Sequence, residues 1–455
     1  MKIAHFSDLH YSPENLDEAD RCFSFAVDDA ISRGARVAVI SGDSTDHRLD
    51  AHAPSLHALA TQVHRLAEVM PVIMLQGTFS HEPPGTLANF ALMGARYPVF
   101  VADRIGQVAL IGTQFRASDG PVFDDAEMLA FDGLYPDAVF TCLPTMNKAD
   151  LALKVGALPA STELGDVLGT YLAAAGRNNA RLRAIGVSTI GVSHGTVAGC
   201  TTEHGVTMAG FDHEFSLGAL FDAECAAFMV GHIHKSQIWL REGRAVGYPG
   251  SIGRFHYGEE GDKGYLLWDV LAAEAHAELV TTPSREMVCI AFDGPPDEAQ
   301  LAALAADSAG KFVRIRWQID EEHKQLVDRK AIESMFASAA GLKLEPRILP
   351  VMRSRAEGIS KAMTVDAKVA RWCELTSVDP DPLLERLQML ETGDAEAIAA
   401  SVLDRIALVG DSIEVPEIPS GTENVVPLVA AGLEAAPEPE STPSLSWLND
   451  DLFAA

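Results

Sequence analysis

The sequence contains little cysteine and no long apolar run. Its six cysteines lie far apart along 455 residues and form no Cys-x-x-Cys pair, which argues against a disulfide framework, a zinc ribbon or an iron–sulfur site. No run of 18 apolar residues occurs, so we expect no transmembrane helix and no membrane partner. The first residues lack the apolar segment of a signal peptide, and we therefore expect a cytoplasmic protein.

Basic residues are also scarce. The chain has 35 Lys and Arg against 64 Asp and Glu, and its net charge of −29 argues against a protein that coats DNA with its whole surface. The charge is uneven, however. Residues 411–455 hold nine acids and no basic residue, whereas residues 340–372 hold seven basic residues and three acids. A local basic face can therefore exist on this acidic chain.

The first 280 residues alternate apolar runs with helical patterns. Helices are predicted where apolar residues recur every three or four positions, between 16 and 34 and between 56 and 67. Strands are predicted at 2–6, 37–41, 71–75, 188–193, 226–230 and 265–270. This alternation predicts an α/β fold, which we expect to be a β-sandwich flanked by helices.

Three further segments follow this core. A small β-α-β unit is predicted from a strand at 312–318, a helix at 330–340 and a strand at 342–349. Residues 364–391 look helical, with interruptions at Pro380 and Pro382, and the Pro- and Glu-rich residues beyond 412 predict a disordered acidic tail with a terminal hydrophobic motif. The predicted domains are an α/β domain at 1–284, a β-α-β domain at 285–363, a helical region at 364–411 and the tail at 412–455.

Polar clusters follow five of the predicted strands. They are Asp8-Leu9-His10, Gly42-Asp43, the segment 77–82, His194-Gly195 and Gly231-His232-Ile233-His234. In open α/β sheets, ligands bind at the carboxyl ends of the strands, so these clusters can converge on one site.

The residue types in these clusters suit a site for two metal ions. Asp8 and His10, like His232 and His234, alternate along an extended chain and can point to the same side. Imidazole and carboxylate together suit manganese, iron or zinc, and Asp43 could bridge two ions. An isolated Asp-x-His is usually a surface strand end and an isolated Gly-Asp a turn. The common placement at strand ends favours the metal site.

The order of the motifs resembles that of a known superfamily. The pattern D-x-H, G-D, a histidine-containing loop, H and G-H-x-H over roughly residues 1–270 resembles the calcineurin-like metallophosphoesterases. The chain looks most like the SbcD-type DNA-repair exonuclease subunit. Its Gly-His-Ile-His-Lys-Ser-Gln is followed by Tyr248-Pro249-Gly250-Ser251 and Lys263-Gly264-Tyr265, and the β-α-β unit resembles that family's DNA-capping domain.

The resemblance implies roles for individual residues. It implies two divalent ions, which we expect to be manganese. The first would be held by Asp8, His10, Asp43 and His234, and the second by Asp43, His194 and His232. His81 would act as general acid or orient the scissile phosphate, with the acid Glu82 beside it.

The segment 77–82 departs from the family pattern. The family's Gly-Asn-His-Asp is replaced by Gly-Thr-Phe-Ser-His-Glu, which is two residues longer and contains no Asn. We expect Ser80, or less favourably Thr78, to supply a hydroxyl in its place. A hydroxyl is a weaker ligand than an amide carbonyl, so the second ion is expected to bind less tightly. The alternative hypothesis is that the second site is degenerate and only residual activity is left.

The resemblance implies a metal-dependent DNA exonuclease or endonuclease that acts in repair or recombination. The alternatives are a small-molecule phosphatase or cyclic-nucleotide phosphodiesterase, and a non-catalytic interaction subunit. Arg353, Arg355 and Lys361 are the predicted DNA contacts, although a solvated basic face would look the same. The helical residues 364–391 are predicted to dock an SMC-like ATPase or to pack on the capping unit. Formation of a homodimer stays open.

Overall fold

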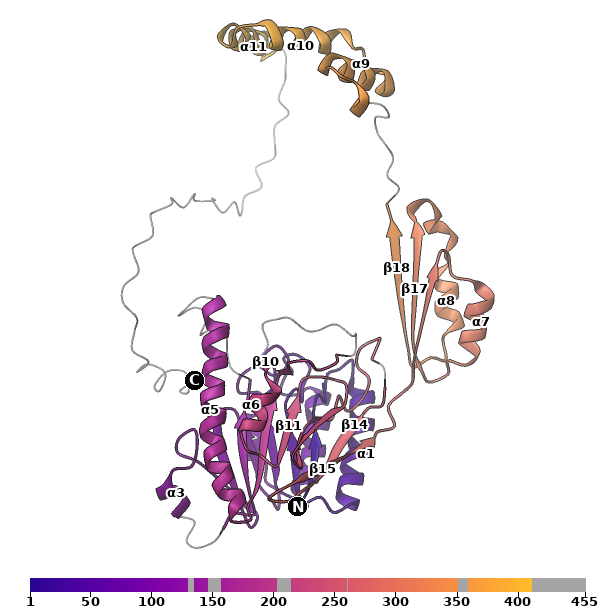
Figure 1. Cartoon of the computed structure of the whole chain (residues 1–455). Coiled ribbons are helices and arrows are strands. Elements are labelled where there is room, and N and C mark those ends of the chain that lie inside the picture. Colours follow the sequence, from indigo (N-terminus) through magenta and orange to yellow (C-terminus); the bar gives the residue numbers. More distant parts are fainter. Residues whose placement is uncertain (130–134, 146–156, 203–213, 260, 351–358, 411–455) are drawn as a thin grey trace. The chain divides into compact units, whose positions relative to one another are not determined.

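The computed structural model describes residues 1–129, 135–145, 157–202, 214–259, 261–350 and 359–410 (Figure 1). Contacts divide the chain into two units, one comprising Met1–Leu349 and one beginning at Pro350, and each is described by itself. Among the described residues, no helix is long and apolar enough to cross a membrane. The predicted acidic tail lies outside the described residues, and the domain boundaries after 284, 363 and 411 stay predictions.

The first unit contains a six-stranded sheet with the order β15-β14-β1-β2-β3-β4. Strands β1 to β4 are parallel, and β14 and β15 are antiparallel additions on the β1 side. Every residue of β2 and β3 is buried, as expected for parallel strands covered on both faces. The strands are β1 (Lys2–Phe6), β2 (Val37–Ile40), β3 (Val72–Leu75), β4 (Val99–Ala102), β14 (Gly264–Val270) and β15 (Ala275–Thr281).

A seven-stranded sheet with the order β12-β13-β11-β8-β7-β5-β6 lies against it. Strands β7, β8, β11 and β13 are parallel, while β5, β6 and β12 run antiparallel to their neighbours. These strands are β5 (Gly106–Ile111), β6 (Gln114–Ala117), β7 (Ala138–Leu143), β8 (Ser188–His194), β11 (Ala227–Gly231), β12 (Gln237–Arg241) and β13 (Arg244–Tyr248). A short parallel pair, β9 (Thr196–Val197) and β10 (Glu214–Phe215), follows β8.

The two sheets enclose one core, and helices cover their outer faces. Ile3, Val39 and Ile73 of the first sheet pack in the same buried cluster as Phe140 and Met229 of the second. Strand residues facing the other way, such as Phe6 on β1, pack against α1 and α2 instead. This arrangement confirms the predicted α/β sandwich with flanking helices. The helices of this part of the chain are α1 (Leu16–Ser32), α2 (Pro54–Ala67), η1 (Ala88–Leu92), α3 (Asp125–Leu129), α5 (Ala157–Ala184) and α6 (Leu217–Asp222).

A separate three-stranded sheet completes the first unit. Its strands are all parallel in the order β16-β17-β18, so the segment contains two β-α-β crossovers where the sequence predicted one. The predicted helix at 330–340 is shorter, because α8 ends at Met335 and a turn follows. The elements are β16 (Met287–Asp293), α7 (Glu298–Ala306), β17 (Phe312–Asp320), η2 (Glu321–Leu326), α8 (Arg329–Met335) and β18 (Gly341–Leu349).

The second unit is helical in its described part. The interruption predicted at Pro380 is confirmed, since α9 and α10 are separated by Ser377, which has a left-handed backbone, and by Pro380. Pro382 does not interrupt a helix, because it lies in the first turn of α10, where the backbone nitrogen has no acceptor within the helix. The elements are η3 (Ile359–Lys361), α9 (Val365–Thr376), α10 (Asp381–Thr392) and α11 (Ala395–Gly410).

Candidate metal centre

The five predicted polar clusters follow β1, β2, β3, β8 and β11. Strands β1, β2 and β3 are neighbours in one sheet, and β8 and β11 are neighbours in the other. The loops after them are joined by backbone hydrogen bonds, such as that from the nitrogen of His10 to the oxygen of Asp43 (3.0 Å). The structure therefore brings residues from position 8 to position 234 into one place.

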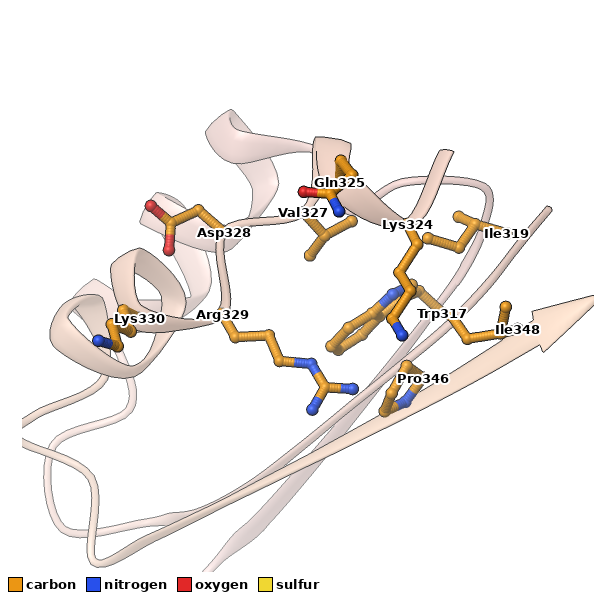
Figure 2. A pocket seen from close by; sticks show the side chains of 10 residues that line it. All are labelled: Trp317, Ile319, Lys324, Gln325, Val327, Asp328, Arg329, Lys330, Pro346 and Ile348. Carbon is orange, nitrogen blue, oxygen red and sulfur yellow. The ribbon is translucent and has the colours of Figure 1, made fainter. Parts of the chain in front are cut away.

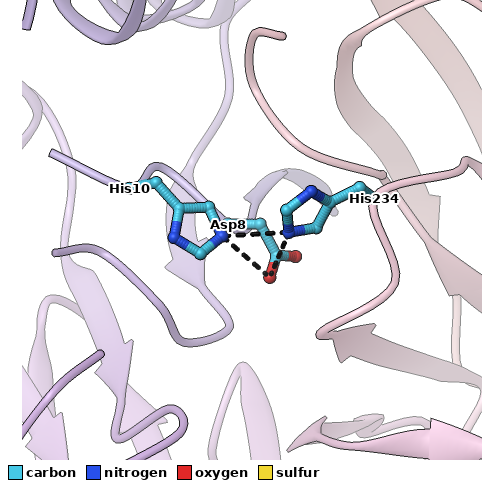
Figure 3. Close-up of side chains that lie close together, drawn as sticks. All are labelled: Asp8, His10 and His234. Carbon is cyan, nitrogen blue, oxygen red and sulfur yellow. Dashed lines mark hydrogen bonds and ion pairs between the residues drawn. The ribbon is translucent and has the colours of Figure 1, made fainter. Parts of the chain in front are cut away.

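Asp8, His10 and His234 form the first donor set (Figure 3). The Nε2 atoms of His10 and His234 are 2.9 Å apart, and Asp8 Oδ1 lies 3.9 and 3.8 Å from them, respectively. Three atoms at these separations lie on a circle with a radius of about 2.1 Å, which is the length of a typical zinc–imidazole bond. This geometry fits a single transition-metal ion.

The two carboxylate oxygens of Asp8 have different surroundings. Oδ2 accepts a hydrogen bond from the backbone nitrogen of His232 at 3.0 Å. Oδ1 is buried and has no hydrogen-bond partner among the described residues. A buried carboxylate oxygen without a partner is costly, and coordination of a cation would remove that cost.

Asp43, His194 and His232 form the second donor set. The Nδ1 atom of His194 lies 2.8 Å from the carbonyl oxygen of Ser41, which can only accept, so Nδ1 carries a proton. His194 therefore turns Nε2 toward the site, where it lies 3.2 Å from Asp43 Oδ2. The structure places Asp43 in this set only, and its bridging of two ions stays a prediction.

Asp43 and His194 shift each other's pKa strongly. Burial alone would raise the pKa of Asp43, but the neighbouring His194 holds it well below its usual range. Burial alone would lower the pKa of His194, but Asp43 raises it to about 10. Without a metal, Nε2 of His194 therefore holds a proton at neutral pH, and a bound cation has to displace it.

Thr78 lies beside this second set. Its Oγ1 is 3.2 Å from His194 Nε2 and 3.3 Å from Asp43 Oδ2, while its backbone nitrogen donates to Asp43 Oδ1 at 2.7 Å. The structure brings Ser80 into neither set: its side chain is exposed. The carbonyl oxygen of Thr78 accepts from the nitrogens of His81 and Glu82, and this turn carries the two additional residues away from the donors.

His81 lies at the rim of the first set. Its ring meets that of His10 edge-on at 4.9 Å, and its Nδ1 lies 2.8 Å from Asp46 Oδ1. Burial alone would lower the pKa of His81, but the hydrogen bond to Asp46 raises it. Sequence reasoning missed Asp46, although its place three residues after Asp43 on the same loop could have indicated it.

Glu82 has a different position from the one expected of a catalytic acid. It is fully buried, and its two oxygens accept from the backbone nitrogens of Ser44 and of Gly77, the latter at 2.7 Å. Burial raises its pKa to about 7. Glu82 therefore connects the loops after β2 and β3, and both of its oxygens are occupied by these hydrogen bonds.

Several donors have a backbone that non-glycine residues rarely adopt. The φ angles of Asp8, His10, Asp43 and His232 are 51°, 46°, 51° and 103°. Such conformations cost free energy and cluster at functional sites, where the surroundings enforce them. This independent feature marks four of the predicted ligands.

The predicted DNA contacts are only partly described. Arg353 and Arg355 lie outside the described residues. Lys361 is exposed at the end of η3.

Comparison with known proteins adds weak likenesses. No family model and no curated protein matches the sequence. Similar solved structures include GAP50, the anchor in the inner membrane complex of Plasmodium, with 12% identity over 62% of this chain and 90% of that one and a TM-score of 0.35. Another is a dimetal phosphatase from Danio rerio, with 10% identity over 62% of this chain and 99% of that one and a TM-score of 0.37. Both TM-scores are low, and the assignment below rests on the chain's own residues.

Proposed function

We propose that this chain is a metallophosphoesterase that hydrolyses phosphodiester bonds in DNA, similar to the SbcD-type repair nucleases. The observation that carries the proposal is the pair of donor sets with the His81–Asp46 pair at their rim. Carboxylate and imidazole donors suit two divalent ions, and we propose manganese.

The chain's own residues divide the work at this site. Two divalent ions held here would supply Lewis-acid activation of water and would neutralise phosphoryl charge. Asp8, His10 and His234 would hold one ion, and Asp43, His194 and His232 would hold the other, with Thr78 beside them. His81, whose pKa is raised by its hydrogen bond to Asp46, would donate a proton to the leaving oxygen of the scissile phosphate or orient that phosphate.

A basic pocket on the three-stranded sheet supports a nucleic-acid substrate (Figure 2). The pocket has a volume of about 360 Å³ and is lined by Lys324, Arg329 and Lys330 against one acid, Asp328. The guanidinium of Arg329 lies 5.9 Å from the ring centre of Trp317, which belongs to the same pocket. Cations around an aromatic ring are typical of surfaces that hold single-stranded nucleic acid.

The helical unit supports a partner protein. Trp372 and Leu375 on α9, Leu390 on α10 and Leu403 on α11 are exposed. We propose that these exposed apolar side chains help to dock an SMC-like ATPase. Packing on the chain's own capping unit, or on a second copy in a homodimer, is the competing explanation.

The net charge of −29 favours a second candidate, a phosphatase or phosphodiesterase for small molecules. An acidic enzyme with small substrates does not have to bind a long polyanion such as DNA against charge repulsion, and it needs no basic pocket. The two functions differ in whether charge changes in that pocket affect turnover.

Hydrolysis assays with manganese test the proposal. The substrates are labelled single-stranded DNA, labelled double-stranded DNA and a small phosphodiester. We expect DNA cleavage that Asp43→Ala abolishes, and that His81→Ala lowers by ~10²–10⁴-fold while both ions stay bound. Arg329→Ala should weaken DNA cleavage and leave the small substrate unaffected. Cleavage of the small substrate alone would favour the second candidate, and wild-type activity of Asp43→Ala would contradict both.

A further inference from the structure

Behind His234 lies a buried ion pair that the proposed mechanism does not use. The carboxylate of Glu259 and the ammonium of Lys263 are 2.6 Å apart, and both side chains are fully buried. Lys263 Nζ also donates to the carbonyl oxygen of His234 and to Ser251 Oγ, each at 2.9 Å. A buried pair is tolerated only when its remaining hydrogen-bonding capacity is met, and here it is.

Glu259 contacts the ring nitrogen of His234 that points away from the first donor set. Glu259 Oε1 lies 2.9 Å from His234 Nδ1, whereas His234 Nε2 faces His10 and Asp8. A carboxylate accepts from Nδ1–H and thereby leaves Nε2 as the nitrogen for an ion. Histidine ligands of metals typically have such a carboxylate behind them, which fixes the tautomer and the orientation of the ring.

We propose that Glu259, held by Lys263, is a positioning residue that orients His234 toward the first ion and sets how tightly that ion binds. This inference rests on the proposed function, because it assumes that an ion occupies the first donor set. It names two residues, Glu259 and Lys263, to which the resemblance gave no role.

A third metal ion between Glu259, His234 and His256 is the competing explanation, since their donor atoms also lie close together. His256 is exposed and stacks on the ring of His234 at 5.7 Å. The carboxylate of Glu259, however, already accepts from His234 Nδ1, from the backbone nitrogen of His256 and from Ser251 Oγ, and pairs with Lys263. An ion there would displace these donors, so the positioning role agrees better with the contacts.

The segment that carries Glu259 is also held by the three-stranded sheet. Arg314 of β17 donates to the carbonyl oxygen of Tyr257 at 2.9 Å, and the Tyr257 ring packs edge-on against Phe312 at 6.1 Å. These contacts restrain the chain two residues before Glu259. A restrained carboxylate orients its partner ring better than a mobile one.

Paired variants test the proposal without leaving a buried charge alone. Glu259→Leu with Lys263→Met removes both the charges and the acceptor, whereas Glu259→Gln with Lys263→Met removes the charges and keeps the acceptor. Glu224→Gln is the matched control, because Glu224 also pairs with two basic residues, Arg183 at 2.7 Å and Arg244 at 3.0 Å.

Manganese titration of the full chain by calorimetry is the first measurement. We expect the Leu/Met variant to bind the first ion ~10–100-fold more weakly, the Gln/Met variant to recover part of that loss, and the second ion to be unaffected. The control should match the wild type. Unchanged binding of the first ion by the Leu/Met variant would overturn the proposal, as would loss of a third ion with wild-type affinity for the other two.

NMR of the metal-free chain labelled at histidine is the second measurement. We expect an exchange-protected Nδ1 proton on His234 in the wild type and in the Gln/Met variant, and its loss in the Leu/Met variant. The same proton in all three would overturn the positioning role. A wild-type chain with that proton but no bound ion would contradict the proposed function itself, so the two failures are distinguishable.

Discussion

At the residue scale, Thr78 and Ser80 differ in where the longer loop places them. Thr78→Asn puts an amide oxygen beside Asp43 and His194, and we expect the second manganese ion to bind up to about tenfold more tightly, or ~1.4 kcal/mol. Ser80→Asn is the matched control and should leave affinity unchanged, because Ser80 is exposed. Calorimetry would contradict this placement if the Ser80 variant alone gained affinity.

The pair of Asp43 and His194 predicts a pH dependence. The pKa of His194 is raised from 6.5 to about 10, so the metal-free chain holds this proton below that pH and the second ion has to release it. The apparent affinity of the second ion should therefore fall by up to about tenfold for each pH unit below 10. Titration at pH 7 and 8 in buffers of different ionisation enthalpy measures the released proton. Release of no proton would show that His194 is neutral in the metal-free chain.

Sequence reasoning identified the donors that belong to short motifs but not their supporting residues. Asp8, His10, His194, His232 and His234 each lie within four residues of a predicted strand end. Asp46 and Glu259, which were not predicted, depend on how a loop turns in space, and so does the choice between Thr78 and Ser80; spacing along the chain does not determine these turns. The hydroxyl was expected from Ser80 in preference to Thr78, but Ser80 is exposed and Thr78 lies beside Asp43 and His194.

At the scale of elements, the end of β11 is packed too closely for any side chain. A Cβ atom on Gly231 would lie 2.2 Å from Ser7 Oγ and 2.3 Å from the backbone oxygen of Ser41. Because the Ser41 backbone belongs to the loop after β2, it cannot move without shifting Asp43. Gly231→Ala should therefore destabilise the metal-free chain by ~1–3 kcal/mol or more.

Gly169→Ala is the control for this substitution. Gly169 lies in α5, and an added Cβ would meet nothing within 4 Å, so we expect a gain of up to about 1 kcal/mol. Urea denaturation measures the free energy of unfolding of both variants. Equal stability of the two variants would mean that the β11 end is more open than the structure shows.

The elements themselves were predictable to different degrees. Strands β2 and β3 are apolar runs between polar segments, and α1 has apolar residues at helical spacing. Strand β16 and helix α7 were missed. They lie at the edge of a small sheet and are partly exposed: in α7 only Leu301 is buried, so the apolar pattern is weak.

At the scale of the whole molecule, all the donor residues lie in the unit Met1–Leu349. A chain that ends at Leu349 should therefore bind the same number of manganese ions with affinities within about threefold of the full chain, or ~0.7 kcal/mol. It should lose only a partner that docks on α9 to α11. Calorimetry and pull-down with the ATPase check this, and weaker metal binding would show that the helical unit contributes to the site.

The central claim is that two ions bind side by side on donors that follow four strands, β1, β2, β8 and β11. Anomalous diffraction from crystals grown with manganese tests it most directly. We predict two peaks, one among Asp8, His10 and His234 and one among Asp43, His194 and His232. A single peak, or peaks away from these six side chains, would contradict the claim.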